Sequence, residues 1–150
     1  SAGKSGYAQA RLKAEGAPVT PQLHAFIEDM ATTCAAVDIV VSRAGASMTA
    51  ELAALGKPSI LVPYPHAADN HQEHNARAFE SAGAAEVLLD ADCTGERLTE
   101  RIRALIAAPG TLTEMGEAAK SLARPLAAEE IAETVIELVY RNADSPSGVT

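Results

Sequence analysis

The sequence predicts an α/β domain in which a Rossmann-like parallel sheet is flanked by helices. Three short apolar runs, each typical of a buried strand, lie at residues 38–42, 59–62 and 86–89. Helical patterns separate these runs, and strands that alternate with helices favour parallel pairing through crossover connections. The composition agrees, because 47% of the residues are apolar and only 3% are aromatic. Such a mixture suits Ala- and Leu-rich helices packed on a small sheet.

The beginning of the chain is predicted to be helical. One helix is expected over residues 7–15 and another over residues 28–37, with a turn at 18–21 and an extended piece at 23–27 between them. Residues 1–18 contain no strand-like apolar run, although a doubly wound domain usually opens on a buried strand. We therefore expect a Rossmann-like sheet that lacks its first strand.

Glycine and proline set the predicted ends of the central helices. The apolar stripe of the helix after the first run consists of Met48, Leu52 and Leu55. Gly56 is expected to end this helix, and Pro58 prevents its continuation. The next helix is predicted over residues 70–81, closed by Gly83, and leads into the third run.

The last third of the chain is predicted to be helical. One apolar stripe consists of Leu98, Ile102 and Leu105, and that of the final helix consists of Ile131, Val135 and Leu138. Between them, Thr111 and Glu114 have the spacing of a capping box. We expect one domain over residues 1–141 and a flexible tail over residues 142–150.

Charge and composition exclude several classes of protein. The net charge is −8 and no Lys/Arg cluster occurs, so nucleic acid is not an expected partner. No basic amphipathic helix is present, and no apolar run approaches the roughly 20 residues that span a bilayer. The chain does not begin with the apolar stretch of a signal peptide. Cys34 and Cys93 are interpreted as reduced thiols of a cytoplasmic protein.

Polar loops follow the first two apolar runs, at residues 43–47 and 63–75. Loops that follow parallel strands lie at the carboxyl edge of the sheet, where α/β proteins bind their ligands. The two loops are therefore predicted to form one candidate site.

The first loop offers small residues and a carboxylate. The small residues Gly45 and Ala46 would let a ligand approach the main chain, and the following helix start favours an anion such as phosphate. Ser47 could bond a phosphate oxygen or simply cap the helix. Glu51 could accept hydrogen bonds from two ribose hydroxyls, or only complement the helix dipole.

The second loop and the helix start after it gather imidazoles, amides and a carboxylate. These residues are His66, Asp69, Asn70, His71, Gln72, His74 and Asn75. Their spacing matches no common zinc signature, and no cysteine joins them. The same groups suit sugar hydroxyls, which both donate and accept. They also suit a solvated helix start with Asp69 as N-cap and Gln72 at the third helical position. No nucleophile with an orienting partner stands nearby, so the catalytic group is unknown.

Taken together, these motifs resemble the carboxyl-terminal half of the MurG family of GT-B glycosyltransferases, over about residues 5–140. The segments that carry the resemblance are residues 26–30, 38–47, 51–58, 62–63 and 69–76. The resemblance implies transfer of N-acetylglucosamine (GlcNAc) from UDP-GlcNAc to a lipid-linked MurNAc-pentapeptide in peptidoglycan biosynthesis. It implies neither a metal nor another cofactor.

The resemblance also implies a role for each polar position. The main chain of Ile27 would pair with the uracil edge, and Glu51 would hold the ribose hydroxyls. The diphosphate would lie against Ala46, Ser47 and Met48. The GlcNAc hydroxyls would face His71, Gln72 and Asn75. His66 would border the cleft and Gly45 would allow close approach, whereas Arg43 would pack or pair rather than contact the ligand.

Members of this family carry features that the present sequence lacks. Their amino-terminal domain binds the lipid acceptor, contacts the membrane and supplies the expected catalytic base, and a glycine-rich loop opens their carboxyl-terminal half. The isolated chain is therefore expected to transfer no sugar and to bind UDP-GlcNAc weakly or not at all. The full-length enzyme would be peripheral on the cytoplasmic face of the inner membrane, with no membrane contact through this chain.

Three alternative functions remain open from the sequence. The chain could be the soluble donor-binding subunit of a split GlcNAc transferase that pairs with a membrane partner. It could instead belong to a UDP-GlcNAc 2-epimerase, which has the same fold and the same nucleotide sugar. A binding or regulatory α/β domain without catalysis is the third.

Overall fold

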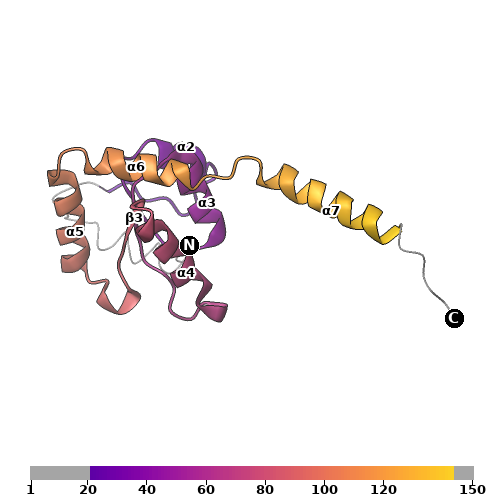
Figure 1. Cartoon of the computed structure of the whole chain (residues 1–150). Helices are drawn as coiled ribbons and strands as arrows, with labels where there is room; N and C mark the ends of the chain where they lie inside the picture. Colours follow the sequence, from indigo (N-terminus) through magenta and orange to yellow (C-terminus); the bar gives the residue numbers. More distant parts are fainter. Residues whose placement is uncertain (1–20, 144–150) are drawn as a thin grey trace. The chain divides into compact units, whose positions relative to one another are not determined.

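The computed structural model describes residues 21–143. The chain divides into two compact units, Ser1–Val37 and Asp38–Thr150, which are described one at a time. Figure 1 labels the elements along the chain. The helix predicted over residues 7–15 and the last seven residues of the predicted tail lie outside the described residues.

The first unit contains helix α2, Met30–Ala35, which is shorter than the predicted helix over residues 28–37. Its N-cap is Asp29, whose carboxylate accepts hydrogen bonds from the Thr32 hydroxyl at 2.6 Å and the Thr32 main-chain N–H at 2.9 Å. Because these two bonds favour the charged form, with the hydroxyl contributing most, the pKa of Asp29 lies below its usual value.

The second unit is built on three parallel strands, as predicted. Strands β1 (Val40–Ser42), β2 (Ser59–Leu61) and β3 (Ala85–Val87) lie in the order β1-β2-β3. In this register Val41 lies beside Ile60, and Ile60 lies beside Glu86. The three strand ends therefore meet at one carboxyl edge, where the polar loops begin.

Helices connect and cover these strands. The α-helices of this unit are α3 (Ala46–Leu55), α4 (His71–Ser81), α5 (Gly95–Ala107), α6 (Thr111–Ser121) and α7 (Ala127–Ala143). Two short 3-10 turns, η1 (Ala68–Asn70) and η2 (Asp90–Asp92), follow β2 and β3. The predicted ends at Gly56 and Gly83 are confirmed, because both glycines adopt the left-handed conformation, with φ of 62° and 76°.

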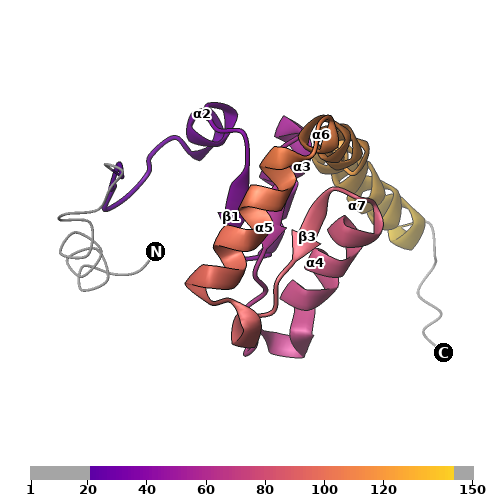
Figure 2. The same cartoon turned by 90° about the vertical axis from the view of Figure 1, so that its left-hand side faces the viewer.

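Neighbouring side chains of β2 enter two different hydrophobic clusters. Leu61 packs with Leu52 of α3 and Phe79 of α4. Ile60 packs instead with Leu105 of α5 and Met115 of α6. Helices α3 and α4 therefore cover one face of the sheet and α5 covers the other, as Figure 2 shows. This double cover explains why β2 is buried along its whole length.

Helix α6 begins differently from the prediction. Gly110, with φ of 83°, is the N-cap, and Thr111 is already helical. The capping box predicted at Thr111 and Glu114 is therefore wrong, since a helical Thr111 is no longer in the cap conformation. The main-chain N–H of Glu114 bonds the carbonyl oxygen of Gly110 at 2.9 Å instead.

The main chains of Gly56 and Gly116 bring α3 and α6 into close contact. A Cβ atom on Gly116 would lie 2.8 Å from the Gly56 carbonyl oxygen. Because this oxygen belongs to the main chain, it cannot move away as the end of a flexible side chain could. We expect Gly116→Ala to lower the free energy of unfolding by about 1–3 kcal/mol in urea denaturation, because the two helices must separate.

Gly95→Ala is the matched control for this substitution. A Cβ atom there meets nothing within 4 Å, and alanine favours the helix by up to about 1 kcal/mol. Equal losses of stability in the two variants would contradict the close packing of α3 on α6.

Helix α7 presents apolar side chains to solvent. Its predicted stripe of Ile131, Val135 and Leu138 is helical, yet these side chains are 64%, 53% and 43% exposed. The sequence pattern therefore predicted the helix but not the environment of its apolar face. Within residues 21–143, no helix combines the length and the apolar composition needed to cross a bilayer.

Candidate functional site

The amino end of α3 stands directly behind the carboxyl end of β1. Gly45 is its N-cap, with φ of −68° and ψ of 151°, and no side chain among residues 21–143 caps the helix. Of the two roles left open for Ser47, the helix cap is therefore excluded, because Ser47 is the second helical residue. The first-turn N–H groups lack helical partners and so remain available to an anion.

Glu51 stands one turn further along α3. Its Oε2 atom is buried and has no hydrogen-bond partner among the described residues. A buried carboxylate oxygen without a donor is unfavourable, so a ligand hydroxyl at this position would satisfy it.

Two residues in the left-handed conformation turn the chain into α4. Asp69 has φ of 49° and Asn70 has φ of 53°, a conformation that Asp and Asn tolerate better than most residues. Asn70, not Asp69, is the N-cap, and its side chain bonds Glu73 at 2.8 Å. The alternative in which Asp69 is the N-cap and Gln72 the third helical residue is therefore wrong, since this turn moves the helix start by one residue.

The predicted sugar-facing side chains of α4 are held by main-chain groups. The Nδ1 atom of His71 lies 2.7 Å from the carbonyl oxygen of Ala68, to which it can only donate. The Oε1 atom of Gln72 accepts from the main-chain N–H of Tyr64 at 3.0 Å. Asn75 donates to the carbonyl oxygen of Ala44 at 3.0 Å, and this bond joins α4 to the loop after β1.

A cavity of about 840 Å³ opens between α3, α4 and the segment after α6. It is lined by Ala46, Thr49, Ala50, Glu51, Ala53, Ala54, Asn75, Phe79, Lys120, Leu122, Ala123, Arg124, Pro125 and Ala127. Three predicted site residues, Ala46, Glu51 and Asn75, thus meet in one cavity. Its volume lies within the range of sites that enclose small molecules.

The other predicted residues do not line this cavity. Those of the second unit are Gly45, Ser47, Met48, His66, His71 and Gln72. His66 is exposed, and its ring meets the edge of Tyr64 at 5.6 Å between centroids. Ile27 belongs to the first unit, so its proposed contact with uracil stays a prediction.

Sequence reasoning missed the far wall of the cavity. Lys120 and Arg124 come from the end of α6 and the segment that follows it, about 70 residues after Glu51 along the chain. Two cations near each other in a chain of net charge −8 were a signal that could have drawn attention to this segment.

No metal centre is found in the part of the chain that the structure describes. Within residues 21–143, no three His, Cys, Asp or Glu side chains are grouped closely enough to hold an ion. Cys34 and Cys93 are not joined in a disulfide.

Comparison with known proteins relates this geometry to glycosyltransferases. Residues 1–131 match the family described as glycosyltransferase family 28 C-terminal domain. A protein of Anaeromyxobacter sp. (strain K) is 50% identical over 129 residues, which are 86% of this chain and 34% of that protein. It is named UDP-N-acetylglucosamine–N-acetylmuramyl-(pentapeptide) pyrophosphoryl-undecaprenol N-acetylglucosamine transferase. A protein of Solibacter usitatus with the same name is 44% identical over 90% of this chain and 35% of its own length.

Two solved structures share the fold. MurG of Acinetobacter baumannii superposes with a TM-score of 0.81 at 30% identity, over 90% of this chain and 41% of that one. The glycosyltransferase VinC, at 23% identity and a TM-score of 0.64 over 89% of this chain and 32% of its own, supports the fold alone. The chain spans about a third of the length of the curated relatives it matches.

Proposed function

Because the chain is a glycosyltransferase family 28 C-terminal domain, we propose that it binds the nucleotide-sugar donor of a GlcNAc transferase. The donor is UDP-GlcNAc, and the acceptor is a lipid-linked MurNAc-pentapeptide of peptidoglycan biosynthesis. The relatives named above are transferases, which supports transfer rather than epimerisation of the nucleotide sugar.

One observation carries this proposal. The start of α3, which no described side chain caps, and Glu51 with its unpartnered Oε2 atom in the second turn belong to one helix, and Asn75 reaches the same cavity from α4. The helix start suits the diphosphate, the carboxylate suits ribose hydroxyls, and the amide suits a neutral polar group. These are three of the four chemical parts of a nucleotide sugar, and the base is the fourth.

The start of α3 would also assist the reaction. When the acceptor hydroxyl attacks the anomeric carbon, the bond to the diphosphate breaks and UDP leaves with additional negative charge. The amides of Ala46, Ser47 and Met48 would stabilise that charge because they are already oriented before it develops. We assign the base that accepts the hydroxyl proton to no residue of this chain.

The remaining roles follow the order of the loops. His71, Gln72 and Asn75 would bond the GlcNAc hydroxyls, with His66 at the border and Gly45 leaving room for the phosphates. The main chain of Ile27 would pair with uracil. The lipid-linked acceptor would be bound by another part of the protein at the cytoplasmic face of the membrane, since the relatives are about three times as long as this chain.

A ligand titration tests this function directly. The ¹⁵N-labelled 150-residue chain would be titrated with UDP, UDP-GlcNAc and, as control, ADP, each to millimolar concentration, where about −4 kcal/mol of binding free energy gives half saturation. UDP should shift the amide signals of residues 44–51, and UDP-GlcNAc should also shift those of residues 66–75. The proposal requires at least weak binding by the isolated chain, so no shifts at millimolar ligand, or equal shifts with ADP, would contradict it.

A further inference from the structure

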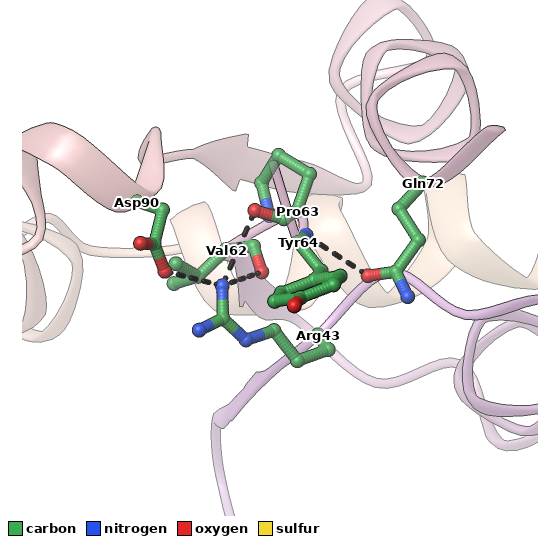
Figure 3. Close-up of polar contacts among 6 residues, drawn as sticks. All are labelled: Arg43, Val62, Pro63, Tyr64, Gln72 and Asp90. Atoms are coloured by element: carbon green, nitrogen blue, oxygen red, sulfur yellow. Dashed lines mark hydrogen bonds and ion pairs between the residues drawn. The ribbon is translucent and has the colours of Figure 1, made fainter. Parts of the chain in front are cut away.

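The guanidinium of Arg43 connects the segments that follow all three strands. Its Nη1 atom donates to the carbonyl oxygens of Val62 and Pro63, each at 3.2 Å. The same atom pairs with Oδ1 of Asp90 at 2.5 Å. Figure 3 shows these three contacts converging on one side chain. Arg43 follows β1, Val62 and Pro63 follow β2, and Asp90 follows β3.

The contacts continue from Arg43 to the proposed sugar-binding side chain. The guanidinium lies 5.6 Å from the centroid of the Tyr64 ring, within the range of a cation–π contact. The main-chain N–H of Tyr64 donates to Oε1 of Gln72 at 3.0 Å. Because this bond occupies the amide oxygen, it leaves the NH₂ group of Gln72 to donate to a ligand.

Arg43 fixes the direction of the main chain after β2 more than it contributes to the free energy of folding. The side chains of Arg43 and Asp90 are 50% and 39% exposed, and ion pairs this exposed to solvent contribute little to folding. The bonds from Arg43 to the carbonyl groups of Val62 and Pro63 matter more for the loop. The last hydrogen bond between β1 and β2 runs from the N–H of Val62 to the carbonyl oxygen of Ser42, and the sheet does not hold the chain after that point. Beyond that bond, main-chain turns close within the loop, from the N–H of Ala67 to Tyr64 and from the N–H of Asn70 to Ala67. The described side-chain bonds that hold the main chain of residues 62–64 come from Arg43 and Gln72.

We propose that Arg43, held by Asp90, is a positioning residue for the loop of residues 62–72, so that Gln72 presents its amide to the sugar of the donor. This inference rests on the proposed function, because the sugar is the group that Gln72 would bond. Arg43 itself need not contact the donor. The three oxygens share the two N–H groups of Nη1, while the planar guanidinium also lies over the Tyr64 ring, a combination that a lysine ammonium does not reproduce.

The first measurement examines the loop without any ligand. Heteronuclear ¹⁵N relaxation of the whole chain reports the order of the amides of residues 64–72. We expect Arg43→Ala to lower that order, with Arg43→Lys intermediate. Arg101→Ala is the matched control, since Arg101 is 51% exposed and pairs with Glu86 at 2.8 Å, away from the loop. Unchanged loop order in Arg43→Ala would overturn the inference.

The second measurement compares UDP with UDP-GlcNAc. We expect the wild-type chain to prefer UDP-GlcNAc, and Arg43→Ala to bind both ligands with a ratio of about one, while its affinity for UDP changes less than about twofold. Asp90→Asn should lower the preference in the same direction. If Arg43 had a purely structural role, Arg43→Ala would bind both ligands more weakly by the same factor, and the preference for UDP-GlcNAc would stay unchanged.

The outcomes separate this inference from the function on which it rests. A wild-type chain that binds neither ligand contradicts the proposed function, and the inference falls with it. A wild-type preference that survives unchanged in Arg43→Ala and Arg43→Lys contradicts the positioning role alone. Should Arg43→Ala fail to fold, the preference of Arg43→Lys and Asp90→Asn decides in the same way.

Discussion

Glu51→Ala is expected to lower the affinity for UDP by about 10- to 100-fold. A carboxylate that accepts two ribose hydroxyls makes charge-assisted hydrogen bonds, whose loss costs about 1.5–3 kcal/mol. The fold should be retained, because alanine favours a helix and the substitution removes a buried oxygen that has no partner in the described structure.

A deoxynucleotide distinguishes the ribose role from a general loss of binding. The wild-type chain should bind UDP more tightly than 2′-deoxy-UDP, whereas Glu51→Ala should bind the two alike. Glu117→Ala is the control, since Glu117 is an exposed glutamate on α6 that does not line the cavity. If Glu51→Ala still discriminates between the two nucleotides, Glu51 does not hold the ribose.

The sheet could be predicted because its signals are local. Short apolar runs mark the strands, and glycines in the left-handed conformation end α3 and α4 where the sequence indicated. The rule that loops after parallel strands share an edge then placed Glu51 and Asn75 in one cavity. These features depend on residue types within a few positions of one another.

The helix starts were predicted less well, and for a common reason. Thr111 was expected as a cap, and Ser47 and Asp69 were each one alternative for a cap, but Gly110, Gly45 and Asn70 hold those positions. A cap depends on the dihedral angles with which the chain enters the helix, and residue preference alone does not determine them. Gly110 and Asn70 hold their caps in the left-handed conformation, whereas Gly45 is extended, so no single residue preference accounts for the three helix starts.

The contacts of Arg43 could not be predicted from sequence patterns. Its partners lie 19, 20 and 47 positions away and depend on how the three strand ends meet. For the apolar stripe of α7, the helix could be predicted but its exposure could not, because helical periodicity does not indicate what covers an apolar face. Long-range geometry is therefore the part of this site that only the structure provides.

Leu52→Ala is expected to lower the free energy of unfolding by about 2–5 kcal/mol, the usual cost of emptying a fully buried leucine site. Leu52 is 0% exposed and packs with Leu61, Phe79 and Ala119, so the cavity would open between the sheet and its covering helices. Because a domain of this size is stable by only about 5–15 kcal/mol, a large part of its stability would be lost.

Urea denaturation measures this loss, with Leu126→Ala as the matched control. Leu126 is 55% exposed, so its truncation should change stability by no more than about 0.5 kcal/mol.

Glu51 and Leu52 are neighbours on α3, yet one side chain reaches the cavity and the other reaches the core. Glu51→Ala should therefore lower the affinity for UDP without lowering the free energy of unfolding. Leu52→Ala should reduce UDP binding only in proportion to the fraction of the protein that is unfolded. Equal stability of Leu52→Ala and Leu126→Ala would contradict the packing of α3 on the sheet, and with it the orientation that places Glu51 at the site.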